Sequence, residues 1–253
     1  MIGAGEAIWQ DVSPLLAGFT VEVLPEVDST NTELMRRARA GRTEPVLLVA
    51  ERQTAGRGRL GRAWASAPGD SLTFSLGLTL APPDWSGLSL AVGVALAETL
   101  HPRVRIKWPN DLWLGDRKLA GILIETASST ADTKGPRYAV IGVGVNIAAP
   151  PGDGLSTPPA GLEEVLPGAR ARDVLLRIAK PLVEAVKAFE SFGFAPFQAR
   201  FDARDALRDR AVALSDGTTG TAHGTTDAGG LLVHTAAGMV AVTSSEVSVR
   251  PAA

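Results

Sequence analysis

The sequence YAVIGVGVNI, residues 138–147, predicts a β-strand whose two faces differ in kind. Side chains alternate along a strand, so the apolar residues at 141, 143, 145 and 147 share one face. Gly142, Gly144 and Asn146 share the other face. A face of two glycines and one asparagine packs poorly in an apolar core, but it lets another group approach the backbone closely. The stretch therefore predicts a sheet with an apolar face and a face suited to a site.

The flanking sequence predicts further strands and helices around this one. Thr30-Asn31-Thr32-Glu33 has the form of a capping box, and Gly41 stands where the following helix would end. Residues 72–80 alternate leucine or phenylalanine with smaller residues, which is typical of a half-buried strand. Pro181 predicts a kink in the third helix. The predicted strands are 46–50, 72–80, 104–108, 112–114 and 118–125, and the predicted helices are 31–40, 88–99, 174–189 and 196–207.

The pattern changes after Arg210 to short strands separated by glycine turns, at 211–214, 220–223, 231–234, 239–242 and 247–250. We therefore expect two domains, 1–207 and 208–253, the second being a small β-barrel. The fold class is α+β, with a mixed sheet, helices packed over it and the barrel at the end. Residues 149–170 are rich in proline and glycine and match no motif, so we expect a surface loop there.

Composition excludes several classes of protein. The 253 residues contain 25 Lys and Arg and 27 Asp and Glu, which gives a net charge of −2, and they contain no cysteine. Disulfides, thiolate metal sites and a globally basic nucleic-acid binder are thereby excluded. The three histidines lack metal-ligand spacing, so no metal site is predicted. The first 35 residues contain no Lys or Arg, and no apolar run is long enough to span a membrane. We expect a cytoplasmic protein without a membrane partner.

Residues 51–62, ERQTAGRGRLGR, combine glycines with arginines. Gly56, Gly58 and Gly61 exclude a regular element and let backbone N–H groups approach an anion. The arginine side chains supply forked donors for phosphate or carboxylate. A solvated basic loop or a nucleic-acid patch is an equal alternative for this segment alone.

The segment Lys107-Trp108-Pro109-Asn110-Asp111 leaves a predicted strand at a forced turn, because Pro109 restricts Trp108 to extended geometry. The polar groups of Asn110 and Asp111 are then free at the end of the strand. Lys118 opens the next predicted strand. Taken separately, the turn and the lysine are more typical of an ordinary surface turn and a solvent-exposed lysine.

Taken together, these segments resemble the biotin protein ligase family in both order and spacing. The matching segments are 28–31 (DSTN), 53–62 (QTAGRGRLGR), 107–111 (KWPND), 117–123 (RKLAGIL) and 142–146 (GVGVN). The tail resembles the SH3-like C-terminal barrel of that family. The resemblance implies a class II synthetase-like catalytic fold and an ATP-dependent biotin–[biotin carboxyl-carrier protein] ligase.

The resemblance implies that biotin and MgATP form biotinyl-5′-AMP, and that the biotinyl group then passes to a lysine. It implies biotin contacts at Ser29, Thr30, Asn31, Gln53, Gly56, Arg57, Gly58, Arg59, Lys118 and Gly121. It implies ATP or adenylate contacts at Arg59, Arg62, Trp64, Asn110, Gly142, Gly144 and Asn146. Arg57 and Lys118 are the expected catalytic cations, and Asp111 is our candidate to orient or deprotonate the acceptor lysine.

The expected partner is the biotinyl domain of a carboxylase, that is, a biotin carboxyl carrier protein. Only about 25 residues precede Asp28, so we expect no DNA-binding repressor domain. We also expect a monomer or a weak homodimer. A lipoate ligase or octanoyltransferase is the nearest alternative, and a nucleic-acid-binding module is the alternative from another class.

Overall fold

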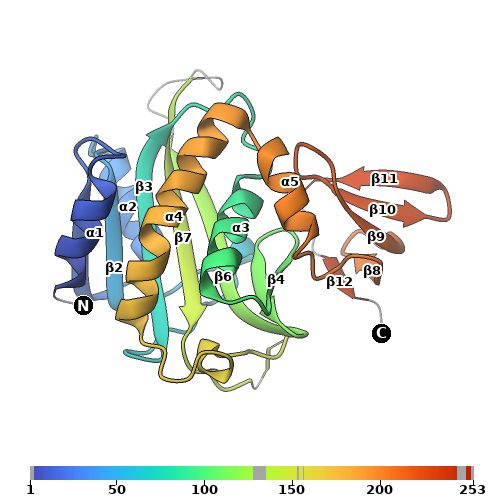
Figure 1. Cartoon of the computed structure of the whole chain (residues 1–253), viewed down its shortest axis with the longest axis horizontal. Helices are drawn as coiled ribbons and strands as arrows, with labels where there is room; N and C mark the ends of the chain where they lie inside the picture. The colour runs from blue at the N-terminus through green and yellow to red at the C-terminus, as the bar shows by residue number, and fades with distance from the viewer. Residues whose placement is uncertain (1–2, 128–134, 153, 156, 244–248, 252–253) are drawn as a thin grey trace.

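The computed structural model describes residues 3–127, 135–152, 154–155, 157–243 and 249–251. It contains a seven-stranded mixed sheet and a five-stranded sheet formed by the C-terminal part of the chain. Figure 1 shows the large sheet with helices on it, and the second sheet beside it next to α5. The predicted α+β class is confirmed.

The large sheet has the strand order β1-β2-β3-β7-β6-β5-β4. β1 and β2 are parallel, and the other neighbours are antiparallel. Strand β7, which contains the glycine face, lies at the centre between β3 and β6, so that Gly144 is opposite Thr73 and Gly121. The strands are β1 (Thr20–Val27), β2 (Val46–Gln53), β3 (Ser71–Leu80), β4 (Val104–Lys107), β5 (Asp111–Leu114), β6 (Arg117–Ala127) and β7 (Arg137–Asn146).

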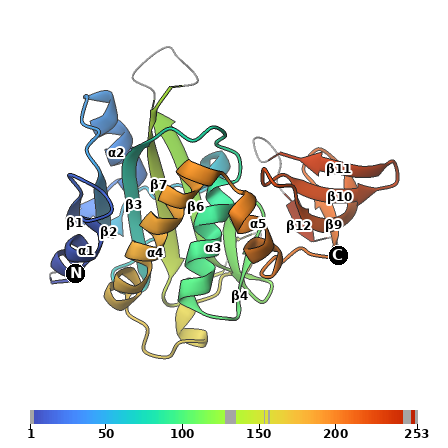
Figure 2. The same cartoon turned by 45° about the horizontal axis from the view of Figure 1, so that its top comes forward.

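Helices cover the two faces of this sheet unequally. The main core lies between one face and helices α1 (Ala4–Val12), α3 (Leu88–Leu100) and α4 (Ala171–Phe192). On the opposite face, α2 (Thr30–Arg39) packs on Leu48, Tyr138 and Val140. Figure 2 shows α3 and α4 together on the near face, with α2 behind the strands. Beyond Val140 the even-numbered face of β7 continues as Gly142, Gly144 and Asn146, and it is left for the site.

The C-terminal sheet has the order β11-β10-β9-β8-β12 and is antiparallel throughout. Its strands are β8 (Ala211–Leu214), β9 (Thr219–Thr225), β10 (Leu231–Thr235), β11 (Gly238–Val242) and β12 (Val249–Pro251). The hairpin of β10 and β11 points away from the large sheet (Figures 1 and 2). Buried residues of this sheet, such as Val212 and Val233, belong to the same apolar cluster as the main core. The small sheet is therefore stabilised by packing on the large one.

The structure differs from the sequence-based predictions at several elements. Helix α1 and strand β1 were not predicted. The N-cap of α2 is Ser29 rather than Thr30, and its hydroxyl accepts from the Thr32 amide at 3.4 Å, so the predicted capping box is wrong. Helix α4 continues through Pro181, and α5 (Ala195–Asp202) ends before the predicted residue 207. Residues 247–248 of the last predicted strand lie outside the described residues.

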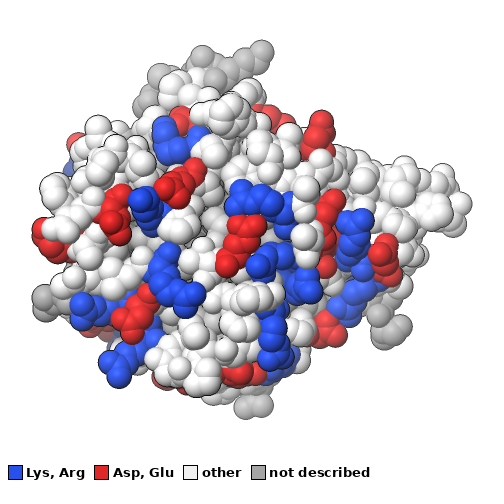
Figure 3. Space-filling view, in the orientation of Figure 1, with Lys and Arg blue, Asp and Glu red and all other residues white. Residues whose placement is uncertain are grey.

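Charges of both signs alternate over the face shown in Figure 3, and no continuous basic surface forms there. This face therefore offers no support for the nucleic-acid alternative. Among the described helices, none is both long and apolar enough to cross a membrane.

The segment between α5 and β8 runs beside β4 and contains a buried carboxyl group. The Ile106 amide donates to the Arg204 carbonyl at 2.8 Å, and the Ala206 amide donates to the Ile106 carbonyl at 2.9 Å. Between them, Asp205 accepts from the Leu207 amide through one oxygen, while its other oxygen is buried with no hydrogen-bond partner among the described residues. Burial raises the pKa of Asp205 to about 6.

The raised pKa predicts a pH-dependent loss of stability. The folded protein keeps the Asp205 proton up to about pH 6, whereas an unfolded aspartate releases it near pH 3.8, so stability falls as pH rises through this window. Asparagine does not titrate, so the Asp205→Asn variant should not lose this stability. We expect the free energy of unfolding of the variant minus that of wild type to rise by about 2 kcal/mol from pH 4 to pH 7.5. Chemical denaturation at both values measures it. For Asp216→Asn, the same difference in free energy of unfolding should fall as pH rises, because hydrogen bonds from Thr218 lower the pKa of Asp216.

Candidate active site

A cavity of about 690 Å³ lies against the glycine face of the large sheet. Its lining comes from the start of α2, the end of β2, the arginine loop (residues 56–64), and strands β5, β6 and β7. Residues 249–251 and Arg210 of the C-terminal part also reach it. Elements distant in sequence therefore meet at the face that the sequence left without apolar side chains.

Two side chains of the protein itself occupy the space above the glycines. A Cβ atom on Gly142 would lie 2.1 Å from Asn31 Oδ1, and one on Gly144 would lie 2.4 Å from Trp64 Cε2. At such distances the Asn31 or Trp64 side chain would have to shift to admit a Cβ atom, so glycine fits best at both positions. Asn31 and the Trp64 indole thus lie directly on the backbone of β7.

On the Asn31 side, neutral polar groups form a buried network that we call the amide pocket: Ser29, Thr30, Asn31, Gln53 and Ser75. Gln53 Oε1 accepts from the Thr30 amide at 2.7 Å. The Asn31 amide nitrogen donates to the Leu123 carbonyl at 3.1 Å and to Glu125 at 3.0 Å, which directs Asn31 Oδ1 toward Ser75. Ser75 has no exposed surface.

The amide pocket contains fewer hydroxyl hydrogens than oxygen contacts. Thr30 Oγ1 lies 3.0 Å from Gln53 Oε1, and Ser75 Oγ lies 2.7 Å from Thr30 Oγ1 and 2.6 Å from Asn31 Oδ1. Each hydroxyl supplies one hydrogen, so the two hydroxyls cannot satisfy all three contacts. The pocket is rich in acceptors and suits a neutral ligand that donates N–H groups.

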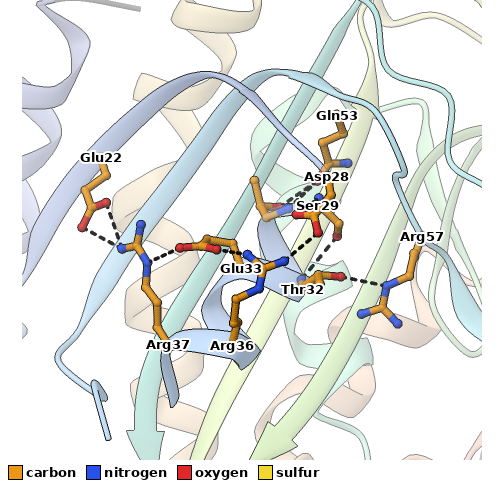
Figure 4. A network of polar contacts seen from close by, with 10 residues as sticks. Glu22, Asp28, Ser29, Thr32, Glu33, Arg36, Arg37, Gln53 and Arg57 are labelled. Carbon is orange, nitrogen blue, oxygen red and sulfur yellow. Dashed lines mark hydrogen bonds and ion pairs between the residues drawn. The ribbon is translucent and has the colours of Figure 1, made fainter. Parts of the chain in front are cut away.

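Ion pairs on α2 keep this network in place. Figure 4 shows Arg37 between Glu22 of β1 and Glu33, and Arg36 reaching Asp28. The Arg37–Glu22 contact is 2.9 Å and the Arg36–Asp28 contact is 2.7 Å. These pairs connect α2 to β1 and to the turn before the helix, so the residues at its N-terminus are fixed over the glycine face.

The arginine loop is closed at its base by backbone hydrogen bonds. The Trp64 amide donates to the Gly56 carbonyl at 2.9 Å, and the Gly58 amide donates to the Arg62 carbonyl at 2.7 Å. The Arg57 guanidinium donates to Thr32 Oγ1 at 3.1 Å and to Glu125 at 2.8 Å (Figure 4 shows the Thr32 contact). Arg57 therefore connects the loop to α2 and β6 on the amide-pocket side.

On the other side of Trp64, the large sheet and the arginine loop contribute four cations to the lining, which we call the cation cluster: Arg59, Arg62, Lys107 and Lys118. Lys118 Nζ lies 2.7 Å from Asp111 Oδ1 and 5.9 Å from the Trp64 ring centroid. Arg59 donates to Asn110 Oδ1 at 3.4 Å. The cluster suits an anion of higher charge than a single carboxylate.

Burial perturbs two members of the cation cluster. Lys107 is 9% exposed, and burial lowers its pKa to about 8, with Asp111 acting in the opposite direction. Lys118, Arg62 and Arg59 add repulsion that lowers the Lys107 pKa further. Burial also lowers the pKa of Arg59. An anion that enters here relieves this repulsion among the cations.

The structure brings together every predicted site residue except one in the lining of this cavity. The exception is Gly56, whose carbonyl is used by Trp64 and which does not line the cavity. Asn110 has a structural contact as well, since its amide donates to the Ile122 carbonyl at 2.7 Å. The lining includes Ser29, Thr30, Asn31, Gln53, Arg57, Gly58, Arg59, Arg62, Trp64, Asn110, Asp111, Lys118, Gly121, Gly142, Gly144 and Asn146.

Sequence analysis missed part of the site. Lys107 was not predicted to be a site residue, although it is one of five lysines in the chain. Ser75 lies on the polar face of a strand predicted to be half-buried, and this face is in fact covered by α2. The segment 149–170 is not merely a surface loop, because Leu155 and Pro158 line the cavity and the Lys118 amide donates to the Pro158 carbonyl. Residues 153 and 156 of this segment lie outside the described residues.

Within the described part of the chain, no group of three or more His, Asp or Glu side chains could hold a metal ion. The carboxylates in the cavity lining are Asp111 and Asp116. A hard cation that brings most of its own oxygen ligands, such as one bound to phosphates, fits this donor set better than a resident metal does.

Comparison with known proteins assigns the fold and the family. Residues 23–146 match the model of the biotin/lipoate A/B protein ligase family, and residues 210–250 match the biotin protein ligase C terminal domain. Biotin–[acetyl-CoA-carboxylase] ligase of Paracoccus denitrificans is 31% identical over 243 residues, covering 89% of this chain and 98% of that protein. The chain belongs to the biotin protein ligase family.

Other ligases show the extent of the similarity. The bifunctional ligase/repressor BirA of Escherichia coli (strain K12) is 37% identical over 211 residues, which is 79% of this chain and 63% of BirA. The chain therefore spans less than two thirds of that relative. The biotin protein ligase from Aquifex aeolicus in complex with biotin and ATP has a TM-score of 0.76 and 30% identity, over 92% of this chain and 99% of that one. The expectation that the chain lacks a repressor function stays a prediction.

The contact of Asn31 with β7 predicts the effect of a single methyl group. Gly142→Ala would displace the Asn31 side chain, which is 3% exposed and hydrogen-bonded to Ser75 and Glu125. We expect a loss of about 1–3 kcal/mol in the free energy of unfolding, measured by chemical denaturation. Gly5→Ala in α1 is the control, since its Cβ would meet Val21 at an ordinary 3.6 Å. An equally small effect of both substitutions would contradict the argument.

Proposed function

We propose that this protein is an ATP-dependent biotin protein ligase. It forms biotinyl-5′-AMP and pyrophosphate from biotin and ATP, and then transfers the biotinyl group to a lysine of a biotin carboxyl carrier domain. The observation that carries the proposal is that one cavity holds the acceptor-rich amide pocket and the cation cluster on either side of Trp64. The solved Aquifex aeolicus relative contains biotin and ATP together.

The amide pocket suits the ureido ring of biotin. That ring carries two N–H donors and one carbonyl acceptor and has no charge. Its N–H groups would donate to the side-chain oxygens of Thr30 and Gln53, two members of the pocket that line the cavity. A buried site built for N–H donors discriminates strongly against ligands without them. Lipoate has no ureido ring, so the pocket favours biotin over the lipoate alternative.

The cation cluster suits the carboxylate and the triphosphate. A carboxylate is already ionised at neutral pH, so adenylation requires no general base. It requires that repulsion between the carboxylate and the α-phosphate be offset, which fixed cations in a buried site can do. We assign this role to Arg59, Lys107 and Lys118, which line the cavity. Arg57, whose guanidinium contacts Glu125, holds the base of the loop, and its predicted contact with the reacting carboxylate would use its other N–H groups.

Mg²⁺ would enter with the ATP phosphates and would be held on the protein by Asp111, the carboxylate next to the cation cluster. It would supply further neutralisation of phosphate charge. Asp111 pairs with Lys118 in this structure, so its first effect is to fix the position of that ammonium group. We further propose that Asp111 orients or deprotonates the acceptor lysine in the transfer step.

The division of labour along the chain follows from the same cavity. We propose that residues 1–207 form the catalytic domain and that residues 208–253 form a small barrel that completes one wall through Arg210 and residues 249–251. The acceptor lysine must reach the cavity from solvent. The partner is therefore a domain that presents a lysine on an exposed turn, as expected for the biotinyl domain of a carboxylase.

The proposal is tested by incubating the full chain with biotin, MgATP and a biotin carboxyl carrier domain. We expect pyrophosphate release on addition of biotin and ATP, and an acceptor whose mass increases by one biotinyl group. Lipoate in place of biotin should give neither signal. Pyrophosphate release with lipoate alone would favour the alternative, and its absence with both acids would overturn the proposal.

The lowered pKa of Lys107 predicts the pH dependence of ATP binding. The ammonium group is mostly charged at pH 7 and mostly neutral at pH 9, because its pKa is about 8. If ATP binds the charged form, its affinity falls as pH rises, by about tenfold at pH 9. Lys107→Arg keeps the charge at both values, so the variant should lose this dependence. Calorimetric titration at pH 7 and pH 9 measures it, and the same slope in both proteins would contradict the assignment.

A further inference from the structure

The C-terminal sheet contacts the motif Lys107–Asp111 through a buried hydrogen bond. Trp108 has no exposed surface, and its Nε1–H donates to the Gly229 carbonyl at 3.0 Å. Gly229 lies in the turn between β9 and β10, 121 residues further along the chain. The tryptophan at the centre of this motif is therefore in direct contact with the C-terminal sheet.

The turn that carries Gly229 is closed by hydrogen bonds of its own and packs closely on its neighbours. The Thr226 amide donates to the Gly230 carbonyl at 2.8 Å, and the Gly230 amide donates to Thr226 Oγ1 at 3.0 Å. Gly229 has φ +83°, and a Cβ there would lie 2.8 Å from Gly87 Cα at the start of α3. The turn therefore contacts both Trp108 and α3. A displacement of the C-terminal sheet would either break the hydrogen bond to the indole or move the indole with it.

Backbone on both sides of Trp108 is also held. Ile106 exchanges two backbone hydrogen bonds with residues 204 and 206, and the Pro109 carbonyl accepts from Ser89 Oγ at 2.9 Å. Lys107, between these anchors, directs its side chain into the cavity. Consecutive residues of one strand end therefore contact the C-terminal sheet and the cation cluster.

A second contact links the two sheets at the cavity wall. Arg210, which directly precedes β8, lies 2.5 Å from Asp116 in the turn before β6, and both residues line the cavity. No comparable contact between the C-terminal sheet and the amide pocket occurs among the described residues in the lining. The C-terminal sheet therefore meets the cation side of the cavity.

We propose that Trp108 is a positioning residue whose hydrogen bond to Gly229 couples the docking of the C-terminal sheet to polyphosphate binding at the cation cluster, leaving the amide pocket unaffected. The inference rests on the proposed function for the identity of the ligands. Coupling between two sites is reciprocal, so a polyphosphate that favours the docked position of the sheet must also be favoured by it. Without the N–H group, the Gly229 carbonyl is buried without this donor.

Trp108→Phe tests the coupling, because phenylalanine keeps a buried ring and removes the N–H donor. Calorimetry on the full chain measures the affinities for ATP, inorganic triphosphate and biotin. We expect both phosphate ligands to bind about tenfold more weakly, in line with loss of a buried hydrogen bond, and biotin to bind within about twofold of wild type. A purely structural role would weaken all three together.

Phe189→Leu is the matched control. Phe189 is fully buried in α4, so its substitution lowers stability but leaves the hydrogen bond between Trp108 and Gly229 in place. It should not separate triphosphate from biotin. Loss of both affinities in Trp108→Phe, or of neither, would overturn the coupling.

Hydrogen exchange on the wild-type protein is independent of whether the variant folds. Triphosphate should protect the amides of residues 226–230, and biotin alone should not. Equal protection by both ligands, or by neither, contradicts the inference. If biotin and ATP give no pyrophosphate but triphosphate binds, protects the turn and is weakened by Trp108→Phe, the proposed function fails and the coupling stands. If triphosphate does not bind, the coupling fails, and pyrophosphate release from biotin and ATP decides the proposed function separately.

Discussion

The site depends on the close approach of side chains to the backbone of β7. Asn31 and Trp64 lie where Cβ atoms on Gly142 and Gly144 would be. Because those positions have no side chains, the N-terminus of α2 and the arginine loop can lie directly on the sheet. The same strand packs Ile141 and Val143 into the core on its other face. A single strand thus stabilises the fold and forms the floor of the cavity.

Polar groups on this floor fall into two kinds separated by Trp64. The amide pocket is neutral, buried and short of hydrogens, whereas the cation cluster is charged and under mutual repulsion. Each side is incomplete without a ligand, and the missing chemistry differs: N–H donors on one side and negative charge on the other. An acid with a neutral, N–H-bearing ring supplies the donors to the amide pocket, and a nucleotide supplies negative charge to the cation cluster. The arrangement therefore favours a reaction that joins these two ligands.

The C-terminal sheet contributes more than a cover. It shares the apolar cluster of the large sheet, and its turn at Gly229 contacts the tryptophan beside Lys107. A small sheet with so little interior of its own is stable only when docked. The packing of the C-terminal sheet on the large sheet therefore both stabilises the chain and helps to shape the site.

Sequence alone determined the elements whose periodicity is strong and local, among them β3, β7 and α3. Its motifs also identified a set of site residues, all of which except Gly56 line the cavity. It missed β1, whose run Thr20–Val27 contains Pro25 and is partly exposed at the edge of the sheet. Only the tertiary structure decided that Ser75 is buried, that Glu125 holds Arg57, and that Trp108 contacts Gly229. Those facts depend on contacts between residues far apart in the chain, which local pattern does not encode.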